Sequence, residues 1–286
     1  MINLSTSQKI KFASFISKIF IFFLGEKKRI INRNGIRYLI DLKEGIDLGI
    51  FLKIQNEKRL YKIQKIFKKE KKHIFIDIGS NVGSITLPLA NIFYKSKIYS
   101  IEPTLYAFSK LKKNISLNPD LKKIISPMNV LISQKNKKIK YVHSSWNFSQ
   151  QASKHKIHLG TLKKTSGKKK SLDKIFLKFK SKIDFIKIDV DGYELDVLKS
   201  GKKIIKKNKP LIHFEFAPYL YKEFGYSPKI LISFIKRDLG YDFYDENFKK
   251  IENIIDLSEQ MTDRSENFFL VHRYNEKIKK KINLIN

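Results

Sequence analysis

The sequence predicts a Rossmann-like, doubly wound α/β fold with a mostly parallel sheet. From His73 onward, apolar runs of strand length alternate with stretches of helical periodicity. A strand that is buried on both faces reads as a continuous apolar run, and helices between such strands cover both faces of a parallel sheet. A tight glycine turn also joins one of these strands to the helix that follows it.

The expected elements follow in chain order. An N-terminal helix, a strand at 36–42 and a helix at 57–67 come first. Strands and helices then alternate, with strands at 74–78, 98–101, 124–128, 183–188 and 211–216 and helices at 84–93, 106–117 and 195–205. The C-terminal part adds a helix at 228–236, strands at 241–244 and 268–271, and a frayed basic tail. The polar, lysine-rich stretch 149–170 is expected to be an excursion loop over the carboxyl edge of the sheet.

The chain is strongly basic, with a formal net charge of +32. Such a charge invites a nucleic-acid partner, because Lys and Arg neutralise phosphates. Only seven of the 59 basic residues are Arg, however, and the lysines are spread along the whole chain together with much Ile, Asn and Phe. That joint bias is typical of an AT-rich genome, whereas groove-binding proteins concentrate Arg. We therefore expect no specific nucleic-acid partner.

The 286 residues include no cysteine, which excludes disulfides, thiolate metal sites and a cysteine nucleophile. The apolar stretch 12–24 contains Lys18 and is shorter than the roughly 18 apolar residues that span a membrane. Its helical spacing predicts a helix packed on the core. The basic run 27–29 that follows leaves peripheral contact with the inner face of a membrane as the alternative. We expect a cytoplasmic protein.

The sharpest local signal is the segment Phe75-Ile76-Asp77-Ile78-Gly79-Ser80-Asn81-Val82-Gly83. Its glycines allow positive φ and close backbone approach, so a ligand can rest on the turn above the N-terminus of the next helix. A strand-to-helix turn without a ligand is the alternative. The candidate cofactor-binding residues here are Asp77, Gly79, Ser80, Asn81 and Gly83.

A second candidate, Glu102, ends the next strand 19 residues beyond Gly83. An acidic residue at about this separation binds the ribose diol of a nucleoside. The dinucleotide pattern needs a middle glycine where this chain has Asn81, and Asp77 would repel a pyrophosphate but stabilise a cation. S-adenosylmethionine carries a sulfonium and no phosphate, so it fits better than NAD.

Four blocks together resemble the FkbM family of methyltransferases. They are the run 77–83, Ile101-Glu102-Pro103, Ser171-Leu172-Asp173, and Ile186-Lys187-Ile188-Asp189-Val190-Asp191-Gly192-Tyr193-Glu194 with Leu198-Lys199-Ser200-Gly201. The resemblance covers about residues 36–272. It implies a seven-stranded class I methyltransferase sheet, S-adenosylmethionine as donor, and O-methylation of sugars or natural products. Where the family has Ser-Asp, this chain has Ser133-Gln134, and Ser133 with Gln134 is expected near the adenine amine.

The candidate catalytic residues are Asp189, Asp191 and Glu194, which follow an apolar strand. Ligands of open α/β sheets bind beyond the carboxyl ends of the strands, and Asp189 and Asp191 share one side because strand residues alternate. A hydroxyl acceptor needs its proton removed, which a carboxylate or a carboxylate-held divalent cation can do. In the alternative reading, Asp191 caps the next helix. We interpret His213 and Glu215 on the next strand as a satisfied core pair, with a further general base as the alternative. His143, His155 and His158 are too scattered for a zinc site.

The predicted function is therefore O-methylation of a hydroxyl on a sugar, glycan or related small molecule. Methylation of base amines and of cytosine C5 is excluded, since the chain has neither an Asn-Pro-Pro-aromatic block after this strand nor a cysteine. An RNA ribose methyltransferase and a non-catalytic cofactor-binding protein remain as alternatives. We divide the chain into a helix-and-strand extension packed on the core (1–70), a methyltransferase domain (71–275) and a basic tail (276–286).

Overall fold

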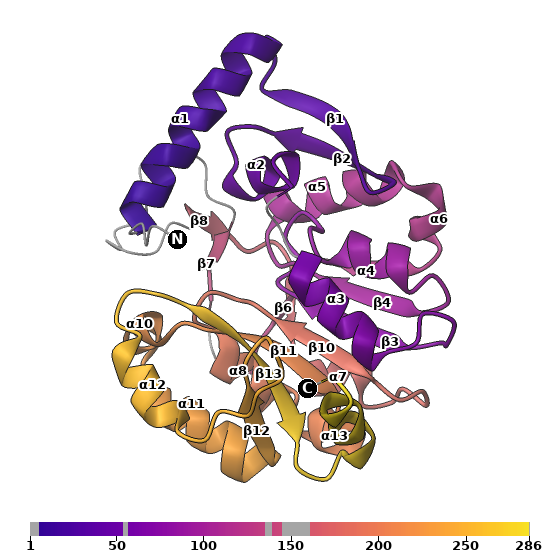
Figure 1. The fold of residues 1–286 in the computed structure, drawn as a ribbon, viewed down its shortest axis with the longest axis vertical. Helices are drawn as coiled ribbons and strands as arrows, with labels where there is room; N and C mark the ends of the chain where they lie inside the picture. The colour runs from indigo at the N-terminus through magenta and orange to yellow at the C-terminus, as the bar shows by residue number, and fades with distance from the viewer. Residues whose placement is uncertain (1–5, 54–56, 135–138, 145–160, 286) are drawn as a thin grey trace.

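The computed structural model describes residues 6–53, 57–134, 139–144 and 161–285. Its centre is a seven-stranded sheet in the order β12-β13-β11-β10-β3-β4-β5 (Figure 1). In that order the strands are Tyr241–Tyr244, Glu266–His272, Leu211–Phe216, Phe185–Ile188, Ile74–Ile78, Lys97–Ile101 and Ile125–Met128. The doubly wound α/β prediction is confirmed.

Five neighbouring strands of the sheet, from β11 to β5, are parallel, and β13 runs antiparallel to both β11 and β12. From β3 the chain passes to β4 and β5 on one side and later to β10 and β11 on the other. The carboxyl ends of β3 and β10 therefore form the topological switch point at which ligands bind in such sheets. In this register Lys187 of β10 lies between Asp77 of β3 and His213 of β11.

Helices cover both faces of the sheet, and successive strand residues enter the two cores in turn. Phe75 and Phe185 belong to one apolar cluster, while Ile76 and Ile186 belong to the other. The first core includes residues of α3 (Glu57–Ile66), α4 (Thr86–Ile92), α5 (Leu105–Ser116), α6 (Pro119–Lys122) and α13 (Glu276–Asn283). The second includes residues of α7 (Leu172–Phe176), α8 (Glu194–Ser200), α9 (Lys202–Asn208), α10 (Pro218–Tyr221), α11 (Pro228–Ser233) with the π-helical turn Phe234–Leu239, and α12 (Ile254–Gln260).

An N-terminal extension packs beside α5. It consists of α1 (Thr6–Leu24), the antiparallel hairpin of β1 (Lys28–Arg33) and β2 (Ile36–Asp41), and α2 (Gly45–Phe51). The side-chain oxygens of Asn114 and Asn118 accept hydrogen bonds from the amides of Leu39 and Arg37 at 2.8 and 2.9 Å. These bonds satisfy the outer edge of β2. In Figure 1, α1 lies at the far end of the extension from the sheet.

Three local predictions differ from the structure. Within 149–170, the described residues form β8 (Thr161–Lys164), which pairs with β7 (Tyr141–Ser144), and β9 (Lys168–Lys170), which pairs with β6 (Val130–Ile132). The helix expected at 195–205 is split at Gly201, where a side chain would lie 2.7 Å from Leu172. The expected frayed tail is the helix α13, which buries Ile278 and Ile282 beside α3.

No helix in the described ranges combines the length and the apolar character needed to cross a bilayer.

Candidate functional site

The glycine turn after β3 is shaped by contact with the neighbouring strand end. Gly79 has φ +77°, and a Cβ there would lie 1.8 Å from the carbonyl oxygen of Asp189. Asn81 also has positive φ, at 49°. At Gly83, with φ +91°, the space is taken by Leu87 and Leu111, 2.9 and 2.8 Å from a built Cβ. Glycine is thus required at both positions, for contact with β10 at the first and for helix packing at the second.

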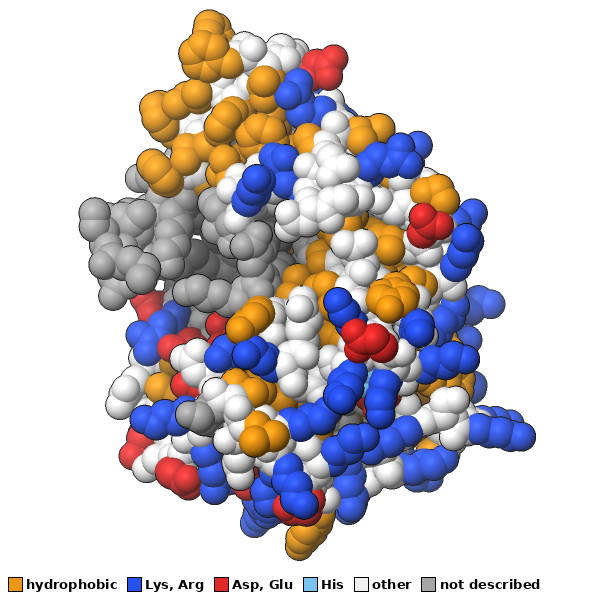
Figure 2. Space-filling model, turned by 45° about the vertical axis from the view of Figure 1, so that its right-hand side comes forward, with side chains coloured by type: hydrophobic (Ala, Val, Ile, Leu, Met, Phe, Trp, Pro, Cys, Tyr) orange, Lys and Arg blue, Asp and Glu red, His pale blue; other side chains and the backbone are white. Residues whose placement is uncertain are grey.

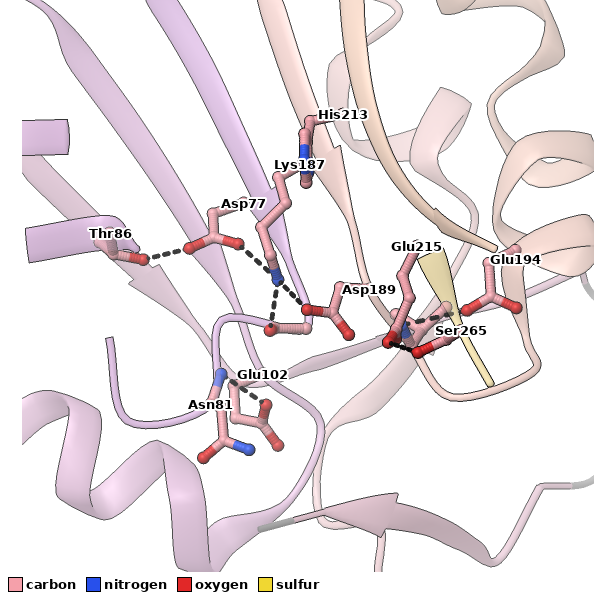
Figure 3. Close-up of polar contacts among 12 residues, drawn as sticks. Asp77, Asn81, Thr86, Glu102, Lys187, Asp189, Glu194, His213, Glu215 and Ser265 are labelled. Atoms are coloured by element: carbon pink, nitrogen blue, oxygen red, sulfur yellow. Dashed lines mark hydrogen bonds and ion pairs between the residues drawn. The ribbon is translucent and has the colours of Figure 1, made fainter. Parts of the chain in front are cut away.

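Glu102 lies directly across from this turn. Its carboxylate accepts a hydrogen bond from the Asn81 amide at 3.0 Å (Figure 3). It also accepts hydrogen bonds from the Thr104 amide and hydroxyl at 2.9 and 2.6 Å. Burial raises the pKa of Glu102, and the bonds from Thr104 oppose that shift. A carboxylate has about four lone-pair positions, so it retains acceptor capacity for a diol. The structure thereby brings Glu102 together with Gly79, Ser80 and Asn81.

Ser80 supplies an independent sign that the turn fits a polar ligand. Its amide donates to the carbonyl of Ile101 at 3.1 Å. Its hydroxyl is buried and has no hydrogen-bond partner among the residues that the structure describes. A buried hydroxyl without a partner is costly, and a bound polar group at the turn would satisfy it. The residues of the turn and Glu102 would therefore hold a nucleoside such as that of S-adenosylmethionine.

Asp77 lies beneath the turn, inside the protein. The Thr86 hydroxyl donates to its carboxylate at 2.6 Å, and Lys187 Nζ lies 3.5 Å from the other oxygen. Lys187 also donates to the Gly79 carbonyl at 3.1 Å and pairs with Asp189 at 3.1 Å (Figure 3). The charge of Asp77 is therefore matched by a buried lysine. A direct contact between Asp77 and the sulfonium stays a prediction, and its visible role is to anchor Lys187 under the turn.

An acidic cluster of Asp189, Asp191 and Glu215 lies at the carboxyl ends of β10 and β11. One carboxylate oxygen from each residue lies within 4.8 Å of those from the other two, and all three side chains are partly exposed. The Ser265 hydroxyl donates to Glu215 at 2.8 Å, and Glu215 also hydrogen-bonds Asp189. Gly79 touches the backbone of Asp189, so this cluster adjoins the cofactor turn.

Burial and the closeness of the three carboxylates in the acidic cluster raise the pKa of two of them. The pKa of Asp191 is raised to about 7, chiefly by burial and then by the charge of Asp189, while Lys187 opposes the shift. The pKa of Glu215 is raised well above its usual range by burial and then by the charges of Asp189 and Asp191. Carboxylates this close cannot all ionise, so the group shares protons. It can accept and release a proton near neutral pH.

Glu194 has a different place from the other two predicted catalytic residues. It is fully buried at the start of α8, and one oxygen faces the amides of Val190 and Gly192, each at 3.3 Å. Burial raises its pKa to about 8. These bonds hold the turn that carries Asp189 and Asp191, which makes Glu194 a positioning residue. Asp191 has φ +49°, so the turn is also strained where the carboxylate projects.

Ser133 is buried, but its hydrogen bonds join it to Gln134 and Lys170 and not to the glycine turn. Its hydroxyl donates to the Gln134 carbonyl at 3.3 Å, and its amide donates to the Lys170 carbonyl at 3.1 Å. The Gln134 amide donates to Asp196 of α8 at 3.2 Å. Asn129, which precedes β6, does contact Glu102: its side chain donates to the Glu102 carbonyl at 2.9 Å. A contact of Ser133 with adenine stays a prediction.

Sequence reasoning missed Lys187 and gave Glu215 the wrong partner. Lys187 interrupts an otherwise apolar strand, and a lysine at such a position could have indicated a buried ion pair. The predicted pair of His213 and Glu215 is wrong, because Glu215 belongs to the acidic cluster while His213 Nε2 lies 3.8 Å from Glu246. Of the other histidines, His155 and His158 lie outside the described residues.

Parts of this chain are similar to known transferases and methyltransferases. A curated tRNA(Phe) (4-demethylwyosine(37)-C(7)) aminocarboxypropyltransferase of Pyrococcus horikoshii is 31% identical over 85 residues, which are 30% of this chain and 28% of that protein. The solved methyltransferase FkbM of Methylobacillus flagellatus KT is 14% identical with a TM-score of 0.46, over 78% of this chain and 50% of that one. The M. jannaschii TYW2 structure in complex with AdoMet is also 14% identical, with a TM-score of 0.43, over 86% and 84% of the two chains.

The chain therefore spans about half of the solved FkbM protein, and its match covers little more than a quarter of the curated relative. The family profile described as "Methyltransferase FkbM domain" matches residues 77–243, from the aspartate under the glycine turn to strand β12. That match includes the turn, Glu102 and the acidic cluster, and it covers more than half of the sequence. The chain belongs to the FkbM family of S-adenosylmethionine-dependent methyltransferases.

Proposed function

We propose that this methyltransferase acts on a hydroxyl group of a sugar, a glycan or a related small molecule. The observation that carries the proposal is the acidic cluster beside the cofactor turn, whose carboxylates take up a proton near neutral pH. A sugar hydroxyl is a weak nucleophile until a base accepts its proton. An amine or a thiolate acceptor has less need of such a group.

When bound, S-adenosylmethionine supplies a methyl group on a positively charged sulfur. Transfer of that methyl group would release the proton of the acceptor hydroxyl, and the acidic cluster would accept it. The residues of this chain must hold the acceptor oxygen about 3 Å from the methyl carbon and in line with the breaking bond. The contact between Gly79 and Asp189 keeps the cofactor turn and the base side by side.

Within the acidic cluster, we assign proton acceptance to Asp191. Its pKa of about 7 suits a base that works near neutral pH, and it is partly exposed to an acceptor. Asp189 is already paired with Lys187 at 3.1 Å and hydrogen-bonds Glu215, which suits it to hold the acidic cluster in place. Glu194 holds the turn from behind.

A divalent cation held by the same three carboxylates is the second way to activate a hydroxyl. Lys187 competes with a cation for the charge of Asp189, and Glu215 is already hydrogen-bonded, which favours the proton-accepting route. A chelator separates the two routes. Turnover that stops with EDTA and returns with Mg²⁺ or Mn²⁺ would establish the metal route, and unchanged turnover would leave the carboxylate base.

RNA ribose is the second candidate acceptor, favoured by the net charge of +32 and by the partial match to an enzyme named for tRNA(Phe). We expect that charge to produce only weak, sequence-independent binding that disappears near physiological salt. Fluorescence anisotropy with short RNA and duplex DNA measures it. Nanomolar, sequence-selective binding at that salt would move the assignment to RNA. A non-catalytic role is disfavoured because the acidic cluster is intact.

The acceptor class is tested by incubating the enzyme with donor that carries a labelled methyl group and with separated glycans, lipids and RNA from its source. Label is expected in the glycan or small-molecule fraction, in an alkali-stable ether linkage. The Asp191→Asn variant serves as the control for label that arrives without catalysis. Label confined to RNA or protein would contradict the proposed acceptor while leaving the methyltransferase assignment in place.

A further inference from the structure

The N-terminal helix α1 presents a continuous apolar stripe to solvent. Its side chains are exposed by 58%, 61%, 37%, 81% and 76% at Phe12, Phe15, Ile19, Phe22 and Phe23 respectively. At about 100° per residue these five positions fall within roughly 100° of arc on the helix. Figure 2 shows the corresponding apolar side chains gathered over α1 at the top of the molecule. We call these five residues the α1 stripe.

Packing on the core does not account for the α1 stripe, since another face of the helix makes the core contacts. Ile16, Phe20 and Leu24 pack against the first apolar core, and Phe20 contacts Phe51 with ring centroids 4.9 Å apart. The Ser17 hydroxyl on the same side donates to the Leu42 carbonyl at 2.7 Å. The helix is therefore docked by one face while four phenylalanines and an isoleucine point outward on another. Clustered exposed aromatics mark an interaction surface.

The charges near the α1 stripe indicate which partner it fits. Lys18 is exposed on the same helix, and Lys27 and Lys28 are exposed just beyond its C-terminal end, against a single exposed acidic residue, Glu26. The whole chain carries a formal charge of +32. A helix that combines an aromatic face with flanking lysines is suited to the interface of a bilayer with anionic lipids. A second copy of this chain would bring the same positive charges together and be repelled.

We propose that α1 docks the protein on the surface of an anionic lipid bilayer. The helix lies in the plane of the interface, with the α1 stripe among the upper acyl chains and the lysines at the headgroups. The aromatic side chains leave water, and the lysines are attracted to the negative surface of the bilayer. The inference is independent of which hydroxyl the enzyme methylates.

Sedimentation of the full chain with lipid vesicles tests this surface. The wild type is expected to sediment with phosphatidylcholine vesicles that contain phosphatidylglycerol and to stay in solution with phosphatidylcholine alone. The double variant Phe22→Glu, Phe23→Glu should lose about tenfold or more in partitioning, since it places charge in the apolar layer. The matched control is Tyr274→Glu, Leu284→Glu, because those side chains are equally exposed, at 77% and 87%, near the opposite terminus. It carries the same change in charge and should bind as the wild type does.

Two results would overturn the proposal. If both double variants bind anionic vesicles equally, the attraction is only the net charge of the chain. If the wild type ignores vesicles but forms a dimer that Phe22→Glu, Phe23→Glu dissociates in light scattering, the α1 stripe binds a second copy. Equal melting temperatures for all variants, measured by circular dichroism, show that the fold is kept.

The absence of cysteine permits a second, positional measurement. A single Phe22→Cys variant labelled with an environment-sensitive dye is expected to increase in emission and shift to the blue on anionic vesicles. The same dye on a Leu284→Cys variant should not respond. Emission that rises equally at both positions would contradict docking through α1.

Discussion

Two groups of charged side chains lie side by side at this site, a buried group around Lys187 and the partly exposed acidic cluster. Beneath the glycine turn, Asp77 and Asp189 share the ammonium of Lys187, and the Thr86 hydroxyl donates a hydrogen bond to Asp77. Next to it, the acidic cluster adds the carboxylates of Asp191 and Glu215, whose pKa values are raised by burial and by their negative neighbours. The inner group places a buried ammonium between two carboxylates, whereas in the outer group the raised pKa values of Asp191 and Glu215 mean that the carboxylates bind protons.

The difference separates structural charges from chemical ones. A matched buried pair fixes geometry and titrates little, and removing one partner leaves an uncompensated charge. A group of carboxylates that lie close together holds protons that it can exchange at neutral pH, which is what a base requires. We therefore expect substitutions in the inner group to change stability and those in the outer group to change turnover.

The largest effect is expected from the outer group. Asp191→Asn keeps the side-chain volume but cannot accept the acceptor's proton, so turnover should fall by about 10² to 10⁴. The affinity for S-adenosylmethionine, measured by calorimetry, should change no more than a few-fold. Asp120→Asn, which alters an exposed carboxylate in a surface ion pair, is the control. If Asp191→Asn turns over normally while Asp189→Asn does not, Asp189 takes the role of base.

Breaking the inner group should cost stability. Lys187→Met leaves Asp77 buried without its cation, a loss of about 3 to 5 kcal/mol in the free energy of unfolding. Urea denaturation measures it. Adding Asp77→Asn should restore part of the loss, because the uncompensated charge is then gone. Additive destabilisation by the two substitutions would mean that they do not interact, and would remove the distinction between the two groups.

The cofactor side of the site predicts a smaller effect. Glu102→Ala removes the predicted charge-assisted bond to a ribose hydroxyl and the bond that holds the Asn81 amide, so donor affinity should fall by about 1 to 3 kcal/mol. Glu102→Gln keeps one acceptor oxygen and should fall between this variant and the wild type. Titration calorimetry with the demethylated product gives the same ranking without turnover. Unchanged affinity in Glu102→Ala would move the ribose contact to another residue.

The pH dependence of turnover reports directly on the outer group. Because the pKa of Asp191 is raised to about 7, its base form is scarce in acid and increases as the pH rises through that value. The turnover number should rise about tenfold per pH unit below the pKa and level off above it. In Asp191→Asn this rise should be absent. A flat profile in the wild type would mean that proton removal does not limit the reaction.

The smallest effect concerns Glu194, which holds the turn. Burial raises its pKa from 4.5 to about 8, so between these values the folded protein binds a proton that the unfolded chain has released. The stability that the protonated Glu194 contributes is fully present below about pH 4.5. It is lost as the pH rises from there through about 8. Relative to the wild type, Glu194→Gln should therefore melt a few degrees higher near pH 9 and hardly differently near pH 5. A stabilisation that is equal at both pH values would contradict this origin.

The sequence predicted the parallel strands and the cofactor turn because both depend on local patterns. Continuous apolar runs mark strands buried on both faces, and Gly79 to Gly83 mark the turn. The helix at the C-terminus was missed because lysines outnumber the two isoleucines at 278 and 282, which are spaced by one helical turn and buried. Strand β9 was missed since its sequence is three lysines, and only its pairing with β6 makes it a strand.

The charge balance of the site could be predicted only in part. Asp189 and Asp191 are two positions apart in the sequence, so strand alternation predicted that they lie on one side. The contacts of Lys187 with Asp77 and of Glu215 with Asp189 depend on the order and register of three strands that are far apart in sequence. That register is set by the packing of the whole sheet, which no single segment encodes.

The contact at Gly79 also limits how this enzyme can be altered. Since a single methyl group at position 79 would overlap the carbonyl of Asp189, the donor turn and the acceptor strand end fit each other as one surface. A chimera that takes its acceptor-binding loops from a relative must take the segment 77–83 with 185–192 as a unit. Directed evolution for new acceptors should likewise find few tolerated changes where Gly79 meets Asp189, and more at positions away from this contact.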